Sequence, residues 1–137
     1  MTEGITVLVV DDEPDVRWVL EMILLKNGFV VALAASGQEA MQWLHEHSCQ
    51  LMLVDAKLND IEGLELIIRI RNETTCLAPA ILVSGFFYAD DAIIKQRLKM
   101  GHISAFVAKP FRHDEIIKSI RAVLMRGGYA STVATTP

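Results

Sequence analysis

A single carboxylate, Asp55, ends one of the most apolar stretches of the chain. Residues 51–54 read Leu-Met-Leu-Val. A short continuous apolar run is typical of a central strand in a parallel sheet, which is covered on both faces. Asp55 would then lie at the carboxyl end of that strand, where open α/β sheets bind their ligands. The alternative role for Asp55 is to cap a turn, because Asp is common after strands.

Three acidic residues, Asp11, Asp12 and Glu13, follow a second apolar run in the same way. Residues 5–10 are rich in β-branched side chains, which favours a buried first strand. Pro14 comes next and suits the first turn of a helix. Capping of that helix explains one or two of the acids but does not require all three. We therefore predict a metal-binding role for Asp11 and Asp12.

Two further polar residues end predicted strands. Residues 80–83 form an apolar run that stops at Ser84-Gly85, and residues 103–108 form another that stops at Lys109. A hydroxyl followed by Gly at a strand end is either a turn signal or a ligand contact.

Five predicted strands alternate with five predicted helices. The strands are residues 5–10, 29–34, 51–55, 80–83 and 103–108. The helices are about residues 14–26, 36–47, 64–72, 89–100 and 114–125. Parallel strands need right-handed crossovers, so this alternation predicts a doubly wound parallel sheet with helices on both faces. The polar strand ends then meet at one edge of the sheet.

Local signals add detail to two of the helices. Ser36 and Glu39 match a capping box at the start of the second predicted helix. In the fourth, the apolar stripe of Ala92, Ile93 and Leu98 is interrupted by charged residues. That pattern predicts a surface helix that is weakly anchored on one side.

The carboxylates gathered at one edge repel one another unless a cation neutralises them. Mg²⁺ fits such a site, because it prefers oxygen ligands and is typically held by one or two carboxylates plus phosphate oxygens. Beside Mg²⁺, a lysine and a hydroxyl, Asp55 can act as a nucleophile toward a phosphoryl group and form an aspartyl-phosphate.

Composition narrows the function classes. The 137 residues are 52% hydrophobic with a net charge of −4, which favours one well-packed domain that does not bind nucleic acid directly. Cys49 and Cys76 form neither a C-x-x-C pair nor a metal-type cluster, so we interpret them as buried or idle thiols in a reducing compartment. Apolar runs stay well below the ~20 residues of a membrane span, and no signal peptide is evident. We expect a cytoplasmic protein without membrane contact.

These residues, in this order, resemble the signature of the receiver domains of two-component response regulators. The resemblance covers about residues 5–126 and rests on Asp11-Asp12-Glu13, Asp55, Gly63, Ser84 and Lys109-Pro110-Phe111. It implies a flavodoxin-like α/β fold with strand order 2-1-3-4-5, and a signalling switch that depends on phosphorylation. The implied partners are a sensor histidine kinase or phosphotransfer protein upstream and a protein or output domain downstream. We assign residues 1–126 to this domain and residues 127–137 to a flexible tail or the start of a linker.

The resemblance also implies a site. Asp55 is the implied phosphoacceptor, and the domain would catalyse its own phosphorylation and dephosphorylation without being a conventional turnover enzyme. Mg²⁺ would be bound by Asp12, Asp55 and the Lys57 carbonyl, with Asp11 acting through a water molecule.

The resemblance further implies a switch. Ser84 would hydrogen-bond a phosphoryl oxygen, and Lys109 would pair with the phosphoryl group. The peptide bond between Lys109 and Pro110 would be cis. Phe106 holds the position of the switch aromatic residue, and its movement would reshape the face of the fourth helix, fifth strand and last helix. That face is also a candidate homodimer surface. It carries Lys95, Lys99, His102 and Arg112, with Phe87 and Tyr88 near its edge.

The sequence departs from the family pattern at three places. Leu58-Asn59 replaces the usual Met-Pro pair, which predicts a less rigid loop after Asp55. Gly85 stands where Ala is common, and Phe106 stands where Tyr is frequent. None of these changes removes a catalytic group.

Three other functions were considered. A flavodoxin-like electron carrier is disfavoured, because Asp11-Asp12-Glu13 would repel the phosphate of FMN. A phosphatase with an Asp nucleophile would need an acid two residues after Asp55, where Lys57 stands. The remaining alternative is an interaction scaffold with a receiver fold that works without phosphorylation.

Overall fold

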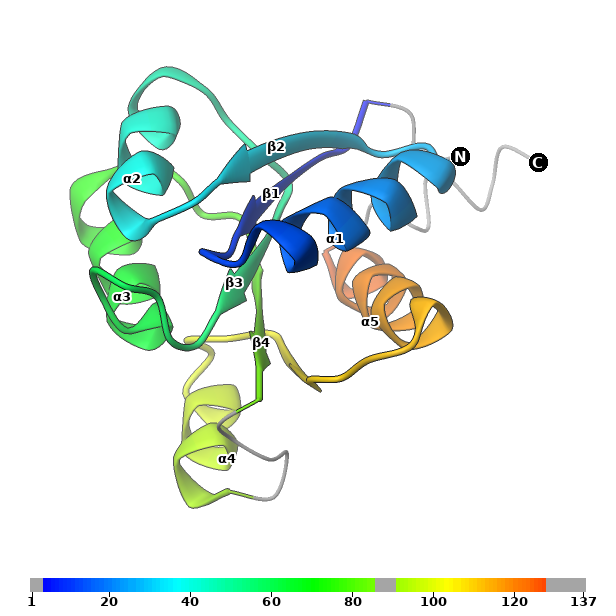
Figure 1. Ribbon diagram of the computed structural model, residues 1–137. Coiled ribbons are helices and arrows are strands. Elements are labelled where there is room, and N and C mark those ends of the chain that lie inside the picture. The colour runs from blue at the N-terminus through cyan, green and yellow to red at the C-terminus, as the bar shows by residue number, and fades with distance from the viewer. Residues whose placement is uncertain (1–3, 86–90, 128–137) are drawn as a thin grey trace.

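The computed structural model describes residues 4–85 and 91–127, which form an alternating series of strands and helices (Figure 1). The strands are β1 (Thr6–Val10), β2 (Val30–Ala34), β3 (Leu51–Asp55), β4 (Ala80–Ser84) and β5 (Ala105–Ala108). The helices are α1 (Pro14–Lys26), α2 (Gly37–Glu46), α3 (Gly63–Glu73), α4 (Ala92–Lys99) and α5 (His113–Arg126). The predicted element order is therefore confirmed.

The five strands form one parallel sheet in the order β2-β1-β3-β4-β5. This confirms the doubly wound fold. In the register, Val10 pairs with Val54, and Asp55 pairs with Val83. The carboxyl ends of β1, β3 and β4 consequently lie at the same edge of the sheet.

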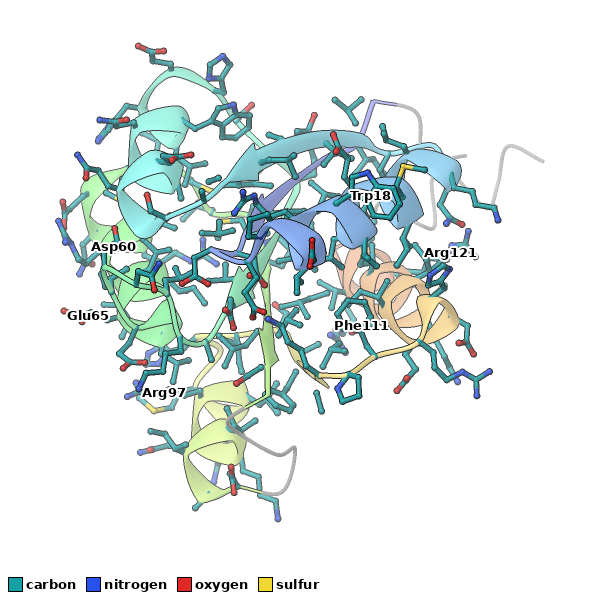
Figure 2. The ribbon with its side chains drawn as sticks, in the orientation of Figure 1. Trp18, Asp60, Glu65, Arg97, Phe111 and Arg121 are labelled. Carbon is teal, nitrogen blue, oxygen red and sulfur yellow. The ribbon has the colours of Figure 1, made fainter. Side chains whose placement is uncertain are left out.

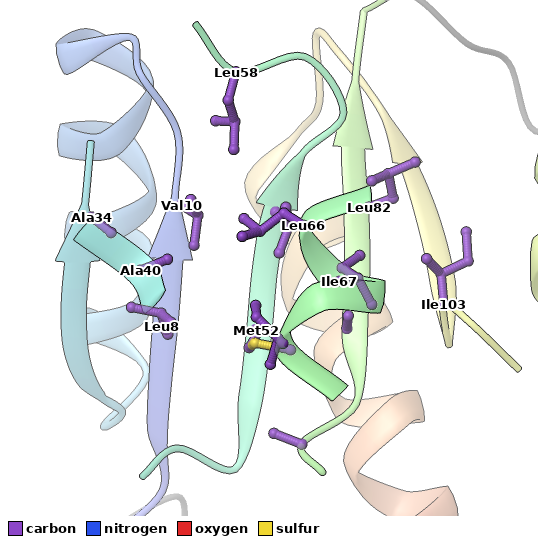
Figure 3. Packing of buried hydrophobic residues seen from close by; sticks show 14 of the residues in the cluster. Leu8, Val10, Ala34, Ala40, Met52, Leu58, Leu66, Ile67, Leu82 and Ile103 are labelled. Atoms are coloured by element: carbon purple, nitrogen blue, oxygen red, sulfur yellow. The ribbon is translucent and has the colours of Figure 1, made fainter. Parts of the chain in front are cut away.

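Helices cover both faces of this sheet. Figure 1 shows α1 and α5 on one side, and α2 and α3 on the other. Because side chains alternate along a strand, Leu8 and Met52 pack toward α2 and α3, while Val9 and Leu53 pack toward α1 and α5. Figure 3 shows the first of these layers, with Leu66 of α3 lying over the central strands. Burial on both faces explains why β1, β3 and β4 are uninterrupted apolar runs.

Three strands begin later than the apolar runs predict. β1 starts after Ile5, β2 after Phe29, and β5 two residues after Ile103. All three of these side chains are nonetheless buried. Ile5 and Phe29 pack in the core layer of α1 and α5, and Ile103 packs in the layer on the other face. The apolar runs therefore extend beyond the strands themselves.

The capping signal at α2 is largely confirmed, whereas Glu13, the N-cap of α1, makes no side-chain capping hydrogen bond. At the start of α2, Ser36 Oγ accepts a hydrogen bond from the Glu39 backbone N–H at 3.1 Å. The Glu39 carboxylate accepts from the N–H of Ala35, one residue earlier than a capping box requires. At the end of α1, Gly28 adopts a φ of 85°, a conformation that favours glycine.

The predicted apolar stripe of α4 is wrong. Ala92, Ile93 and Leu98 are all exposed, and Ile94 is the buried residue of this helix. One buried side chain makes α4 the weakly anchored helix that its charges predicted. Its predicted start at residue 89 lies outside the described residues.

The helices of the described ranges include none that is both long and apolar enough to cross a bilayer. Helix α5 ends at Arg126 with Gly127 as its cap. Most of the predicted tail, residues 127–137, lies outside the described part of the chain, so the domain boundary stays a prediction.

Candidate functional site

Four carboxylates meet at the carboxyl edge of the sheet. One oxygen from each of Asp11, Asp12, Glu13 and Asp55 lies within 4.8 Å of the others. Asp11 directly follows β1, and Asp55 ends the neighbouring strand β3. The structure thus brings together the acids that the strand ends predicted.

Lys109 lies among these acids. Its Nζ is 2.9 Å from Asp11 Oδ2, 3.4 Å from Glu13 Oε1 and 3.6 Å from Asp55 Oδ1. The residue follows β5, where its backbone N–H donates to the Ser84 carbonyl at 2.8 Å. The bond from Lys109 to Pro110 is cis, as the resemblance implied.

Burial sets the protonation of this cluster. Asp11 is 1% exposed and Asp55 is 5% exposed. Burial raises the pKa of Asp55 to about 6; the negative charges of Asp11 and Asp12 add to this rise, and Lys109 opposes it. Burial also disfavours the charged form of Lys109, but its hydrogen bond to Asp11 and the surrounding acids outweigh burial and raise its pKa.

The two aspartates after β1 are held differently. Asp11 Oδ1 accepts the Glu13 backbone N–H at 2.9 Å, and Oδ2 accepts Lys109. Arg17 donates to the Asp11 backbone carbonyl at 2.7 Å, which ties the turn to α1. Asp12 is half-buried, and its carboxylate makes no hydrogen bond or ion pair to any described residue. Of these two aspartates, Asp12 is therefore the one with open coordination positions.

Ser84 and Phe106 occupy neighbouring strands on one face of the sheet. Ser84 is fully buried at the end of β4 and pairs with Ala108 of β5. Phe106 pairs with Leu82 and packs, half-buried, against the core layer beneath α2, α3 and α4. Because side chains alternate along strands, Ser84 and Phe106 are diagonal neighbours on that face.

The loop after Asp55 is held at several points. The Leu58 N–H donates to the Ile61 carbonyl at 3.2 Å, and Lys57 forms an ion pair with Glu62 at 3.8 Å. Leu58 itself is buried in the core. Helix α3 begins at Gly63, one residue before its predicted start and one of the residues on which the resemblance rests.

Asp60 in this loop is a positioning residue that the sequence analysis missed. Its two carboxylate oxygens accept the backbone N–H groups of Gly37 and Gln38, at 3.0 and 2.9 Å. These groups belong to the unpaired first turn of α2. Figure 2 shows Asp60 between α2 and α3. Because its partners lie more than twenty residues earlier in the chain, no local pattern revealed the contact.

Residues 7–121 match the family described as the response regulator receiver domain. The chain belongs to this family. Two relatives are the transcriptional regulatory protein AfsQ1 of Streptomyces coelicolor, 35% identical over 127 residues, and the transcriptional regulatory protein KdpE of Mycobacterium tuberculosis, 32% identical over 125. The matches cover 93% and 91% of this chain but 54% and 53% of those proteins, so the chain spans about half their length.

Solved receiver domains have the same fold. A CheY-like receiver domain protein from Methanospirillum hungatei is 25% identical with a TM-score of 0.76, and the match covers 89% of this chain and 94% of that one. The receiver domain of the Francisella response regulator 1452 is 22% identical with a TM-score of 0.78, covering 90% and 99%. That second likeness concerns the fold alone.

The acidic cluster fits the Mg²⁺ site that receiver domains generally have. Within the described ranges, Lys109 is the only cation that forms ion pairs in this cluster, with Asp11, Glu13 and Asp55. The cluster therefore keeps a net negative charge, and its donors are all oxygen atoms, which Mg²⁺ prefers.

Proposed function

We propose that this receiver domain is a phosphorylation-dependent switch whose phosphoacceptor is Asp55. The observation that carries the proposal is the contact of Lys109 with both Asp55 and Asp11 at the carboxyl edge of the sheet. This contact places the nucleophilic carboxylate of Asp55 beside the Lys109 ammonium group, which can also pair with a phosphoryl oxygen. Membership of the receiver family supports the same chemistry.

The reaction is phosphoryl transfer from a phosphohistidine of a sensor histidine kinase or phosphotransfer protein. A carboxylate oxygen of Asp55 attacks phosphorus, the P–N bond of the donor breaks, and the imidazole leaves with the electron pair. Because the pKa of Asp55 is about 6, its carboxyl group is mostly ionised at neutral pH and can act as a nucleophile. Lys109 stabilises the charge on the transferred group, and the Ser84 hydroxyl donates to a phosphoryl oxygen.

Asp12, Asp55 and the Lys57 carbonyl are the proposed direct ligands of Mg²⁺, with Asp11 acting through water. When bound, Mg²⁺ neutralises the acids and the developing charge on the phosphoryl oxygens. The open carboxylate of Asp12 supports its role as a direct ligand. Both oxygens of Asp11 are already engaged, which supports an outer position.

Ser84 and Phe106 are the proposed switch. Movement of Ser84 toward the phosphoryl group frees space on the sheet face that Phe106 shares, and the phenyl ring turns inward. The surface formed by α4, β5 and α5 then changes. Helix α4 has a single buried residue, Ile94, which supports the proposal that this helix moves most easily. Phe87 and Tyr88, expected near the edge of this surface, lie outside the described residues.

The proposal for a downstream partner rests on two relatives that are named as transcriptional regulatory proteins. Each of them is about twice as long as the matched region. We infer that residues 1–126 act on an output domain or a separate protein, and that the α4–β5–α5 surface is the contact or a homodimer interface. We further propose that the protein is cytoplasmic and that this domain does not contact nucleic acid or a membrane directly.

The test is incubation of the full chain with Mg²⁺ and acetyl phosphate, followed by intact mass spectrometry. We expect the mass of one phosphoryl group, removed by hydroxylamine as for an acyl phosphate. Asp55→Asn should abolish the gain, while Asp114→Asn, a change at an exposed carboxylate of α5, should retain it. Equal labelling of Asp55→Asn and the wild type would refute the assignment.

Beryllofluoride, which mimics a phosphoryl group, tests the switch. NMR shifts extending along residues 84–111, beyond the shell of Asp55, support it. Shifts confined to the loops that touch Asp55, or no phosphorylation at all, favour the alternative of a phosphorylation-independent scaffold.

A further inference from the structure

The two cysteines of the chain meet at the amino edge of the sheet, opposite the phosphorylation site. Cys49 precedes β3 and Cys76 precedes β4, and these strands pair so that Met52 lies opposite Ala80. The Met52 backbone N–H donates to the Pro79 carbonyl at 2.9 Å, which holds the two entering segments together. Cys76 packs against the core cluster that contains Cys49, and both residues line the same pocket, where each thiol shifts the pKa of the other. Residues far apart in the sequence thus form a dithiol pair.

The segment that carries Cys76 is fixed in place. Its backbone N–H donates to Thr74 Oγ1 at 3.0 Å, and Arg71 donates to the carbonyls of Cys76 and Ala78 at 3.4 and 2.6 Å. Hydrogen bonds therefore hold the backbone around Cys76 in place beside β3 and α3.

Small molecules can reach this pair. Both cysteines line a pocket of about 280 Å³, together with the exposed residues His47, Thr75 and Leu77. Cys76 is half-buried, whereas Cys49 is buried. An oxidant entering the pocket meets the sulfur of Cys76 first.

The two thiols differ in acidity. Hydrogen bonding to Cys76, together with burial, raises the pKa of Cys49. The hydrogen bond from Cys49, the Ala78 backbone N–H and the Arg71 guanidinium lower the pKa of Cys76. The accessible sulfur thus carries the thiolate, which is the reactive form, and the buried sulfur stays protonated beside it.

We propose that Cys49 and Cys76 are a reversible modification site at which peroxides convert a dithiol into an intramolecular disulfide. The Cys76 thiolate attacks one peroxide oxygen, the O–O bond breaks, and Cys76 becomes a sulfenic acid as hydroxide leaves. Cys49 sulfur then attacks Cys76 sulfur, the S–O bond breaks and water leaves with the Cys49 proton. Two electrons pass from the sulfurs to hydrogen peroxide, and a cellular dithiol returns them on reduction.

The experiment treats the reduced full chain with hydrogen peroxide, in the presence of glutathione as an internal reference and without Mg²⁺ or phosphodonor. After quenching with catalase, thiols are alkylated under denaturing conditions and the intact mass is measured. We expect a mass lower by two hydrogens, loss of both alkylatable thiols and full reversal by dithiothreitol. The reaction should be roughly tenfold faster than oxidation of glutathione. A peptide map should join Cys49 to Cys76.

Two variants define the roles. Cys49→Ser should stop at a sulfenic acid on Cys76, which dimedone traps, while Cys76→Ser should leave Cys49 reduced. A wild-type chain that oxidises more slowly than glutathione, gains oxygen without losing the Cys49 thiol, or cross-links to a second chain would overturn the proposal. The wild-type result decides the question even if a variant fails to fold.

Discussion

Gly63 packs directly against the backbone of Asp55. A Cβ atom at position 63 would overlap the Asp55 carbonyl oxygen and would lie 3.0 Å from the Cα of Ala56. The Gly63 N–H also donates to the Ala56 carbonyl at 2.8 Å. The absence of a side chain on Gly63 therefore lets helix α3 begin beside the proposed phosphoacceptor.

Gly63→Ala should destabilise the fold by about 2 kcal/mol or more, because rigid backbone atoms must move to admit the methyl group. Urea unfolding measures the loss. Gly85→Ala is the matched control: among the described residues a Cβ there comes near only Lys109 Cβ, at 3.8 Å, and stability should change little. Equal stability of the two variants would contradict the packing argument.

Lys109 compensates the charge of the buried Asp11. In metal-free buffer, Lys109→Met should lower stability by about 2–4 kcal/mol, because it leaves that carboxylate without its cation. The same change should raise the pKa of Asp55 further, since Lys109 now opposes the rise. Urea unfolding measures the first effect, and NMR titration of the Asp55 carboxyl group measures the second. Lys118→Met, on the exposed side of α5, should show neither effect.

The central architecture was predictable because it depends on local hydrophobicity. The apolar runs of β1, β3 and β4 are continuous, so their ends could be placed to within one or two residues, and with them Asp11, Asp55 and Ser84. The resemblance to receiver domains supplied the strand order, which local patterns do not contain.

Features that depend on tertiary contacts were not predictable in the same way. Helix α4 buries one side chain, so its sequence does not determine which apolar residue faces the core, and Ile94 was missed. Asp60 caps a helix that precedes it by more than twenty residues. Cys49 and Cys76 are adjacent only because β3 pairs with β4.

The raised pKa of Asp55 gives stability a definite pH dependence in metal-free buffer. Between the ordinary value of 3.8 and about 6, the folded state binds more protons at Asp55 than the unfolded state. Stability from this group is therefore lost as pH rises through that window, by about 2–3 kcal/mol. The measurement is the difference in unfolding free energy between wild type and Asp55→Asn at several pH values. A difference independent of pH would contradict this expectation.

Asp60 should affect the pH dependence of stability in the opposite direction to Asp55. Burial raises the pKa of Asp60, but the hydrogen bonds from the Gly37 and Gln38 N–H groups together outweigh burial and lower this pKa. The stabilisation by Asp60 is therefore lost as pH falls through the acidic range. Asp60→Ala should cost about 1 kcal/mol at neutral pH, since two N–H groups of α2 lose their acceptor. Thermal unfolding measures this, with the exposed neighbour Asn59→Ala as control. Equal losses in both variants would rule out a specific cap.

Mg²⁺ should stabilise the protein, because it neutralises a four-carboxylate cluster that is paired with Lys109. A ligand that binds only the folded state, present at ten times its dissociation constant, adds about 1.4 kcal/mol to the free energy of unfolding. Chelation of Mg²⁺ should remove this gain. Asp12→Ala should lose more of the gain than Asp11→Ala, because Asp12 alone of the two has open oxygens. Thermal unfolding with and without Mg²⁺ checks the order, and Asp15→Ala, at an exposed acid in the first turn of α1, should respond like wild type. If Asp12→Ala keeps the full gain, its carboxylate is not a direct ligand.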